Sequence, residues 1–268
     1  MVQFQGRVLI IAGSDSGGGA GIQADIKTVT ALGGYAATAI SALTIQNTLG
    51  VTGFHPVPPE FVTAQARAVL EDIGADTIKT GMLGDVAMVE AVAAILDTAK
   101  DIPVVIDPVM VAKGGATLLN PTAVAAMRSL LVPRAALLTP NAPEAEALTG
   151  IAVVSLADQR RAGMALLELG ARAVLMKGGH LQGETLIDLL MTPDTEAAFE
   201  TLRVDTRHTH GTGCTLASAC AVGLAQGLSL TQAVARAWAY VQEAIAGAPG
   251  FGAGHGPLDH AWPLRGKV

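Results

Sequence analysis

The sequence has few aromatic residues, only two cysteines and no cluster of basic residues. Phenylalanine, tryptophan and tyrosine make up 3% of the 268 residues, although 50% of the residues are hydrophobic. The apolar residues are therefore mostly alanine, valine, leucine and isoleucine, which suits parallel strands covered by alanine-rich helices. Because the net charge is −6 and no basic run occurs, we do not expect binding to nucleic acid or to an anionic membrane surface.

Long apolar runs and a leader-like N-terminus are also missing. No window reaches the roughly 18 uninterrupted apolar residues that a membrane-spanning helix needs. Residues 1–15 hold no charged region followed by an apolar stretch, and they predict a first strand rather than a signal peptide. Cys214 and Cys220 form no CxxC motif and are expected on one helix, pointing in different directions, so no disulfide is predicted. These features favour a reducing, cytoplasmic location.

Short β-branched runs alternate with longer helical patterns along the chain. Strands are predicted over residues 7–12, within 36–48, and over 76–82, 102–110, 135–141 and 172–179. Helices are predicted over residues 20–33, 59–74, 85–99, 121–132, 156–170, 213–227 and 230–248. Residues 184–192 and 196–204 are typical of an antiparallel hairpin. The alternation predicts an α/β fold with a mostly parallel sheet and helices on both faces. Because no linker, repeat or low-complexity stretch occurs, we expect residues 1–268 to form a single domain.

Two common glycine-rich nucleotide motifs are absent. Residues 12–25, AGSDSGGGAGIQAD, fit neither G-x-G-x-x-G nor G-x-x-x-x-G-K-[ST], and no Gly-Lys-Ser/Thr occurs anywhere. A Rossmann oxidoreductase and a P-loop NTPase therefore lose their main support. The segment still follows a strand and opens a helix, as a phosphate-binding loop would. Asp15 and Asp25 are its polar candidates, and their simpler interpretations are a turn residue and a solvated helix carboxylate.

A cysteine follows a glycine-rich turn in residues 209–214, THGTGC. At the start of a helix, unpaired backbone N–H groups and the helix dipole favour an anion such as phosphate. The dipole is also expected to lower the pKa of Cys214, which could then accept a proton or act as a nucleophile. Two alternatives stay open, namely a structural cysteine in the core and a nucleophilic pair of Cys214 with His210.

Further polar residues follow the other predicted strands, at the sheet edge where ligands bind in folds of this type. Asn141 and Glu144 could face a hydrated Mg²⁺, or Asn141 could cap a helix that holds Glu144 in its first turn. Lys177 leaves a buried strand before two glycines, which favours an anionic partner. Gln46 could hold the edge of a heteroaromatic ring or be an ordinary loop amide. Met82 could pack on that ring or in the core.

These segments occur in an order that resembles a known family. With KTGML (79–83), DPVM (107–110) and LMKGGH (175–180), they closely resemble hydroxymethylpyrimidine/phosphomethylpyrimidine kinase of thiamin biosynthesis, over roughly residues 6 to 262. The resemblance implies a ribokinase-like fold and ATP-dependent phosphorylation of 4-amino-5-hydroxymethyl-2-methylpyrimidine, then of its monophosphate. It also implies Mg²⁺ and a homodimer, whereas a requirement for a monovalent cation stays open.

The resemblance further implies roles for individual residues. Gly211, Thr212 and Gly213 would donate backbone N–H groups to the transferred phosphoryl group. Cys214 would take the place of the aspartate base of related sugar kinases and deprotonate the substrate hydroxymethyl group. Gln46 would hold the amino edge of the pyrimidine. The remaining residues expected to line the pyrimidine pocket are Gly13, Asp25, Met82 and Val109.

The phosphate and metal side of the site is implied in the same way. Asn141 and Glu144 match an N-x-x-E motif that organises Mg²⁺ and phosphates through water. Asp107 would assist Glu144 at the metal, and Lys177 would contact the phosphates of ATP. Such a transfer depends mainly on positioning and charge stabilisation, so a weak base can suffice.

The sequence departs from the family at two places, and two other functions compete. His208 stands where asparagine is more usual, and residues 111–119, interpreted as a flap over the site, carry no acidic residue. A pyridoxal kinase, which shares the G-T-G-C turn, is the nearest alternative function. A non-catalytic pyrimidine-binding protein on the same fold is disfavoured by the intact turn, the NAPE segment (141–144) and Lys177.

Overall fold

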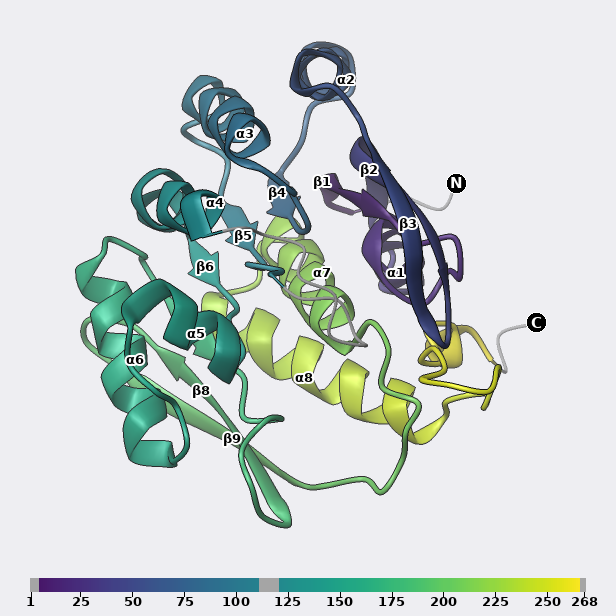
Figure 1. The fold of residues 1–268 in the computed structure, drawn as a ribbon, viewed down its shortest axis with the longest axis vertical. Helices are drawn as coiled ribbons and strands as arrows, with labels where there is room; N and C mark the ends of the chain where they lie inside the picture. The colour runs from purple at the N-terminus through teal and green to yellow at the C-terminus, as the bar shows by residue number, and fades with distance from the viewer. Residues whose placement is uncertain (1–4, 111–120, 266–268) are drawn as a thin grey trace.

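Nine strands form one sheet through the centre of the molecule (Figure 1). The computed structural model describes residues 5–110 and 121–265, and its strand order is β3-β2-β1-β4-β5-β6-β7-β8-β9. The strands are β1 (Arg7–Ser14), β2 (Tyr35–Asn47), β3 (Gly50–Pro56), β4 (Thr77–Thr80), β5 (Val104–Ile106), β6 (Leu137–Leu138), β7 (Val174–Met176), β8 (Thr185–Met191) and β9 (Glu196–Leu202). The six strands from β2 to β7 in this order are parallel, whereas β3 and β8 run antiparallel to their inner neighbours.

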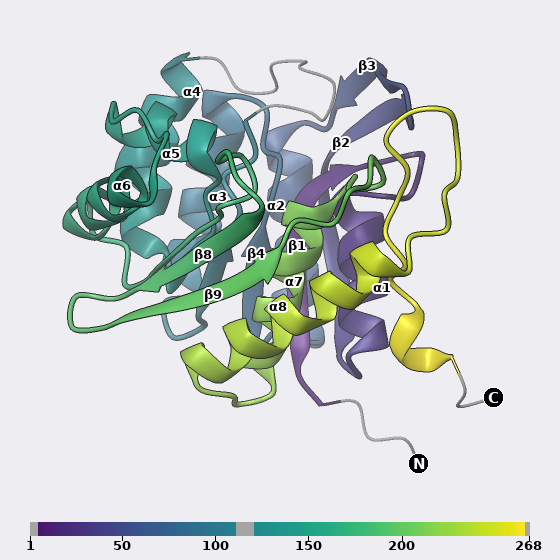
Figure 2. The same ribbon diagram turned by 90° about the horizontal axis from the view of Figure 1, so that it is seen from below.

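Helices cover both faces of this sheet (Figure 2). One face carries α1 (Gly21–Ala31), α7 (Thr212–Ala225) and α8 (Leu230–Ala246). The other face carries α2 (Pro59–Asp72), α3 (Val86–Thr98), α4 (Pro121–Ala126), α5 (Ala142–Thr149) and α6 (Leu156–Glu168). The predicted three-layer, ribokinase-like α/β architecture is confirmed, as the structural comparisons below also show.

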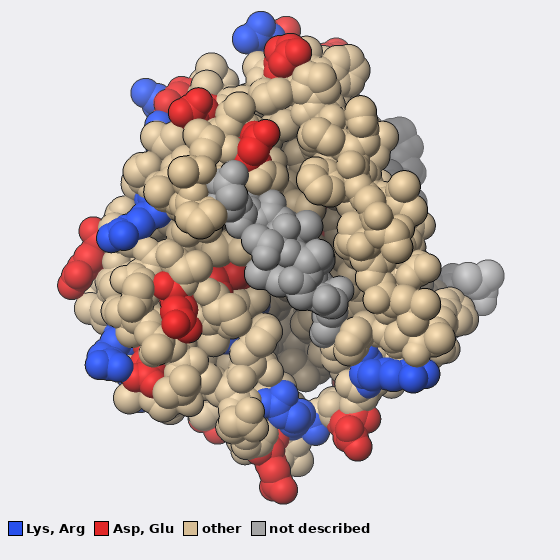
Figure 3. All heavy atoms as spheres, in the orientation of Figure 1, with Lys and Arg blue, Asp and Glu red and all other residues tan. Residues whose placement is uncertain are grey.

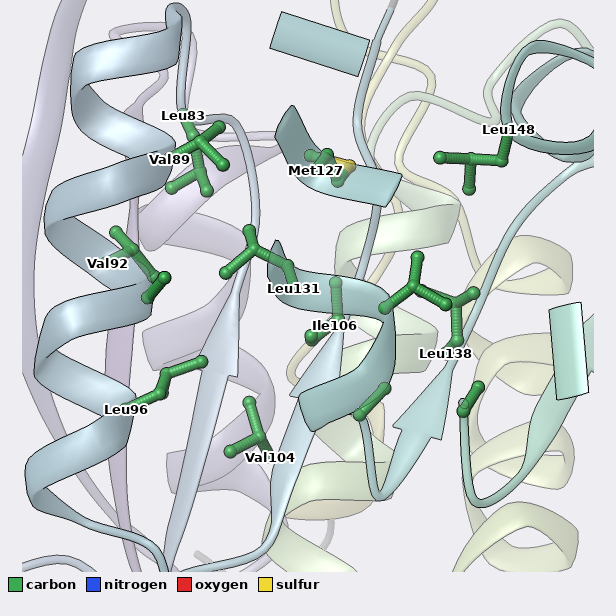
Figure 4. Packing of buried hydrophobic residues seen from close by; sticks show 14 of the residues in the cluster. Leu83, Val89, Val92, Leu96, Val104, Ile106, Met127, Leu131, Leu138 and Leu148 are labelled. Atoms are coloured by element: carbon green, nitrogen blue, oxygen red, sulfur yellow. The ribbon is translucent and has the colours of Figure 1, made fainter. Parts of the chain in front are cut away.

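The alternation of side chains along β1 explains why the strand reads as one continuous apolar run. Val8 and Ile10 enter the hydrophobic cluster beneath α1, α7 and α8, while Leu9 and Ile11 enter the cluster on the opposite face. All four side chains are at most 1% exposed. A strand that is covered on both faces cannot show a polar alternation. Figure 4 shows the second cluster, in which Val92 and Leu96 of α3 lie beside Val104 and Ile106 of β5.

The element bounds differ from the predicted ones mainly at the sheet edge. The structure adds β3, which pairs with β2 as an antiparallel hairpin from Ala42↔Pro56 to Asn47↔Gly50. Glycines and prolines obscure β3 in the sequence, and an edge strand tolerates them. The antiparallel hairpin predicted for residues 184–192 and 196–204 is confirmed as β8 and β9.

The predicted helix 121–132 changes after α4 into a π-helical turn, Met127–Leu131. The predicted flap, residues 111–119, lies outside the described residues.

Charged side chains are dispersed over the face that Figure 3 presents. Lysine and arginine side chains lie around its margin, interspersed with aspartate and glutamate, which agrees with the absence of a basic run in the sequence. In residues 5–110 and 121–265, no helix is both long enough and apolar enough to cross a membrane.

Candidate active site

A cavity of about 1220 Å³ opens where the parallel strands end, against the start of α7. Every predicted site residue except Asp25 lines it. These residues are Gly13, Gln46, Met82, Asp107, Val109, Asn141, Glu144, Lys177, Gly211, Thr212, Gly213 and Cys214. The volume exceeds the 300–1,000 Å³ that is usual for one small ligand, so the cavity has room for a nucleotide beside a small ring.

The turn before α7 can be built only with glycine at its first position. Gly211 has φ of 83°, and a Cβ there would lie 1.8 Å from the carbonyl oxygen of Gly19. The Thr212 N–H points to the Thr209 carbonyl oxygen at 3.4 Å, a long hydrogen bond. A Cβ at Gly213 would lie 3.1 Å from Lys177 Nζ. The glycines therefore bring the helix start close both to the first glycine-rich loop and to a lysine ammonium.

Asp15 organises the first glycine-rich loop. Its carboxylate accepts backbone N–H groups from Gly17, Gly19 and Ala20 at 2.8 to 3.1 Å, and its Oδ2 lies 2.8 Å from His210 Nε2. Burial disfavours the charged carboxylate, but the hydrogen bonds from His210 and the backbone outweigh it and lower the pKa of Asp15. The simpler interpretation of Asp15 as a turn residue is thus correct, and the same residue joins the two glycine-rich segments.

His210 is directed at Asp15 and Gln46. Its Nε2 lies 3.3 Å from Gln46 Nε2, and Gln46 Oε1 accepts a hydrogen bond from Thr44 Oγ1 at 3.2 Å. The same ring nitrogen donates to the Asp15 carboxylate, so it cannot also accept a proton from the Gln46 NH2 group; the contact with Gln46 is a hydrogen bond only when the amide is turned so that its oxygen faces the ring. The geometry places Gln46 beside His210, and it gives no support to a nucleophilic pair of His210 with Cys214.

Met82 faces the cavity opposite this amide. Its carbonyl oxygen accepts a hydrogen bond from Ser41 Oγ at 2.6 Å, which fixes the backbone after β4. A Cβ at position 13 would lie 2.5 Å from Met82 Cε, so Gly13 makes the space that the thioether occupies. A flexible thioether at this place can pack on a flat ring held by Gln46.

Lys177 lies between two carboxylates at the other end of the cavity. Its Nζ donates to Asp107 Oδ1 at 3.0 Å and lies 3.7 Å from Glu144 Oε2. Burial alone would lower the pKa of Lys177, but the two carboxylates raise it above its usual value. Burial raises the pKa of Glu144 to about 7, against the opposing effect of Lys177. One cation faces two carboxylates here, so the cluster carries negative charge that a divalent cation could balance.

Asn141 has the structural role that the sequence left open. Its Oδ1 accepts the Glu144 N–H at 2.9 Å, and Glu144 Oε2 accepts the Asn141 N–H at 2.8 Å. This reciprocal pair is a capping box at the start of α5. The same contacts fix one Glu144 oxygen in place and still leave the carboxyl group on the cavity wall.

Two of the predictions are wrong. Cys214 is half-buried on the cavity wall. Its pKa is raised to about 12, not lowered, because the loss of water around the thiol outweighs Lys79 and the backbone hydrogen bond from Gly21. Asp25 neither lines the cavity nor meets solvent. It is 0% exposed and binds Lys79 Nζ at 2.9 and 3.0 Å. In both cases the sequence shows the local position but not the burial that the tertiary fold imposes.

The sequence analysis missed several charged residues that line the cavity, and Lys79 and Asp188 are the two with a clear signal in the sequence. Lys79 was visible as a lysine inside a buried strand segment, which requires a partner. Asp188 lies in β8 and accepts the Gly178 N–H at 2.7 Å, which shapes the loop after Lys177. An aspartate between the apolar residues of LIDLLM was the corresponding signal.

Comparisons with known sequences show the family of this chain. A sequence model of the family "Phosphomethylpyrimidine kinase" matches residues 15–259. The chain is 51% identical over 256 residues to the thiamine biosynthesis bifunctional protein ThiED of Geobacter sulfurreducens; the match covers 96% of this chain but only 52% of that one. It is 49% identical over 257 residues to the hydroxymethylpyrimidine/phosphomethylpyrimidine kinase of Streptomyces coelicolor, covering 96% and 95% of the two chains.

Solved structures share the fold. The ADP complex of Bacillus subtilis pyridoxal kinase superposes with a TM-score of 0.90 at 35% identity, covering 97% of this chain and 99% of that one. Phosphomethylpyrimidine kinase from Clostridium difficile superposes with a TM-score of 0.80 at 40% identity, covering 89% and 99%. The predicted family is therefore confirmed: this chain belongs to the phosphomethylpyrimidine kinase family and is a kinase.

Proposed function

We propose that this protein transfers the γ-phosphoryl group of ATP to the hydroxymethyl group of 4-amino-5-hydroxymethyl-2-methylpyrimidine, and then phosphorylates the monophosphate. One observation carries the proposal. An anion-binding turn at 211–214, the Lys177 cluster and the Gln46 amide line a single cavity. The names of relatives at about 50% identity support the pyrimidine substrate. The ADP complex of the Bacillus subtilis structure supports ATP as donor.

Three groups of this chain would act in the transfer. The backbone N–H groups at Gly211 and Gly213 and the ammonium of Lys177 would stabilise charge on the moving phosphoryl group. The hydroxymethyl oxygen forms a bond to the γ-phosphorus, the bond from that phosphorus to the oxygen of ADP breaks, and the hydroxyl proton passes to Cys214 Sγ. Only the thiolate form of Cys214 can accept this proton. In the ligand-free protein burial favours the thiol, so the step depends on nearby cations.

The residues present fit Mg²⁺. Within residues 5–110 and 121–265, no group of three His, Cys, Asp or Glu is placed to hold a metal. Mg²⁺ in kinases is typically bound by one or two carboxylates, with water and substrate phosphates as the other ligands. Asp107 and Glu144 supply two such carboxylates, with more negative charge than Lys177 neutralises. Bound Mg²⁺ would neutralise charge on the phosphates.

A requirement for a monovalent cation is a separate prediction, tested by replacing K⁺ with tetramethylammonium.

The alternative substrate is pyridoxal. It is favoured by the TM-score of 0.90 to pyridoxal kinases from Bacillus subtilis and Staphylococcus aureus, although identity to these is only 34–35%. Incubation with ATP, Mg²⁺ and an equal mixture of the hydroxymethylpyrimidine and pyridoxal separates the two functions. We expect pyrimidine mono- and diphosphate by mass spectrometry. Pyridoxal phosphate alone would overturn the pyrimidine substrate, and the absence of any phosphorylated product would overturn the kinase activity.

The proposed base has its own test. Cys214→Ala is expected to bind the pyrimidine as the parent protein does, while phosphoryl transfer falls about 10²-fold or more, the range of a lost general base. Isothermal titration and single-turnover kinetics measure the two effects. Undiminished turnover in this variant would remove Cys214 from the mechanism.

We also propose a homodimer formed through the β2–β3 edge, in the cytoplasm. Leu43 and Ile45 are 48% and 69% exposed on one face of β2, and Leu49, in the turn to β3, is 72% exposed, so this edge presents large apolar side chains. Ile45→Glu is expected to shift the sedimentation coefficient from dimer to monomer. A parent protein that sediments as a monomer would contradict the proposal.

A further inference from the structure

Lys79 belongs to a charged network that the proposed function leaves unexplained. It lies in β4, and its Nζ donates to both oxygens of Asp25 from α1, at 3.0 and 2.9 Å. Ser218 of α7 completes the network, because its Oγ donates to Asp25 Oδ1 at 2.7 Å. The Lys79 and Asp25 side chains are both 0% exposed. Three elements far apart in the chain thus meet at one buried ion pair.

The two residues of the ion pair differ in their position relative to the cavity. Lys79 lines the cavity wall, whereas Asp25 does not. A Cβ at Gly81 would lie 3.1 Å from Lys79 Nζ, so the glycine after β4 leaves room around the ammonium group. The pair therefore places its positive end on the cavity side and its negative end behind it.

Cys214 and Lys79 line the same cavity, and Cys214 is joined to the ion pair through Ser218, which binds the carboxylate that holds Lys79. Ser218 follows Cys214 by four residues in α7, so the two side chains are on the same face of the helix, one turn apart. The charge of Lys79 is the largest effect that opposes the burial-induced rise in the pKa of Cys214. The network that holds Lys79 is thus attached to the helix that carries the cysteine.

Stability alone is a weak reason for such a pair. Removing two charges from water costs free energy that their attraction only partly recovers, and apolar residues of similar size are often equally good or better. A fully buried lysine that lines a ligand cavity is more simply explained by an effect on the chemistry there.

We propose that Lys79 is a positioning residue for phosphoryl transfer: Asp25 and Ser218 hold its ammonium group beside Cys214, where its fixed positive charge stabilises the sulfur as an anion. The thiolate then accepts the hydroxymethyl proton, as in the step described above. Four charged groups act on the Cys214 sulfur, namely Lys79 from β4, Lys177 after β7, Asp25 from α1 and Asp107 after β5. Of the two lysines, Lys79 has a side chain that is 0% exposed, whereas that of Lys177 is 13% exposed.

The test measures the ionisation of the Cys214 thiol directly, in the full-length protein without nucleotide. Iodoacetamide alkylates thiolates, and mass spectrometry of the Cys214 peptide gives the rate at each pH, separately from Cys220. The main variant is Lys79→Met with Asp25→Asn, which removes both charges and leaves no buried ion unpaired. The matched control is Arg160→Met with Glu196→Gln, an exposed pair at 2.9 Å between α6 and β9.

Because the pKa of Cys214 is raised to about 12, the alkylation rates are compared at a fixed pH well below this value, at which the protein is folded. We expect the Lys79/Asp25 double variant to be alkylated about tenfold more slowly than the parent, as for a pKa higher by about one unit. Its kcat should fall about tenfold while the KM for ATP changes little. Lys79→Arg, which keeps the charge, should restore most of the alkylation rate. The control should keep the parent profile. A folded double variant with the parent alkylation profile and kcat would overturn the proposal.

A second variant covers the case in which the double variant does not fold. Asp25→Asn alone leaves the Lys79 charge unopposed, so Cys214 should be alkylated faster than in the parent at the same pH, the opposite direction. An unchanged or slower rate would overturn the proposal. The inference rests on the proposed role of Cys214, and the two can fail separately. Full turnover in Cys214→Ala removes the base, whereas an unchanged alkylation profile in the Lys79 variants removes this inference alone.

Discussion

Two lysine–carboxylate clusters lie at the strand ends, and they differ in their access to water. Lys177 reaches the cavity with 13% of its side chain exposed and faces two carboxylates, Asp107 and Glu144. Lys79 lines the same cavity with a side chain that is 0% exposed, and it is paired with Asp25. The first cluster has unbalanced negative charge and a partly exposed lysine, as a site for a cation and phosphates requires. The second has one positive and one negative charge, both buried. In the proposed mechanism, similar residue types would serve binding in one place and local electrostatics in the other.

The largest expected effect is a difference in unfolding free energy between variants of the two lysines. Lys79→Met leaves the Asp25 carboxylate buried and unpaired, and breaking a buried pair in this way costs about 3–5 kcal/mol. Lys177→Met should cost clearly less, because water in the cavity can solvate Asp107. Urea denaturation of both variants without nucleotide measures the difference. Equal losses of unfolding free energy would mean that the two lysines are buried alike.

The loss of activity should follow the opposite order, with the larger loss in the Lys177 variant. Lys177→Met removes a cation that contacts phosphate in the proposed mechanism, and such losses are about 10²–10³-fold in kcat, or about 2.7–4 kcal/mol. Steady-state kinetics with MgATP check the value, and Lys177→Arg is the charge-matched control. If Lys177→Met retains more than a tenth of the parent kcat, Lys177 does not serve the transfer.

The clusters also show what could be foreseen from the sequence. The strands, their order of appearance and Lys177 follow from local patterns, since a lysine before two glycines at a strand end needs no distant information. Asp25 and Lys79 are 54 residues apart, and Ser218 is 193 residues from Asp25. Their pairing depends on the packing of α1 and α7 on β4. The wrong pKa direction for Cys214 has the same cause, because the helix start is visible in the sequence and its burial is not.

The pH dependence of stability should come more from the Lys177 cluster. The pKa of Glu144 is raised from 4.5 to about 7, so the native state binds more protons than the unfolded state between these values. The contribution of Glu144 to stability is therefore greatest below about pH 4.5 and is lost as the pH rises through about 7. Glu144→Gln should flatten the unfolding free energy across this window in metal-free buffer. An unchanged slope in the variant would assign the titration to another group.

The smallest effect compares one hydroxyl in each cluster. Ser218 Oγ donates to Asp25 at 2.7 Å, and Thr139 Oγ1 donates to Asp107 at 3.2 Å; both residues are 0% exposed. Hydrogen bonds to charged groups contribute about 1.5–3 kcal/mol and ordinary ones about 0.5–1.5 kcal/mol. Ser218→Ala should fall in the upper range, because the carboxylate has no water to replace the lost donor. Thr139→Val should fall in the lower range, because its hydrogen bond is longer and the Asp107 carboxylate keeps its ion pair with Lys177. Thermal and urea unfolding of both variants test the order, and a larger loss in Thr139→Val would contradict it.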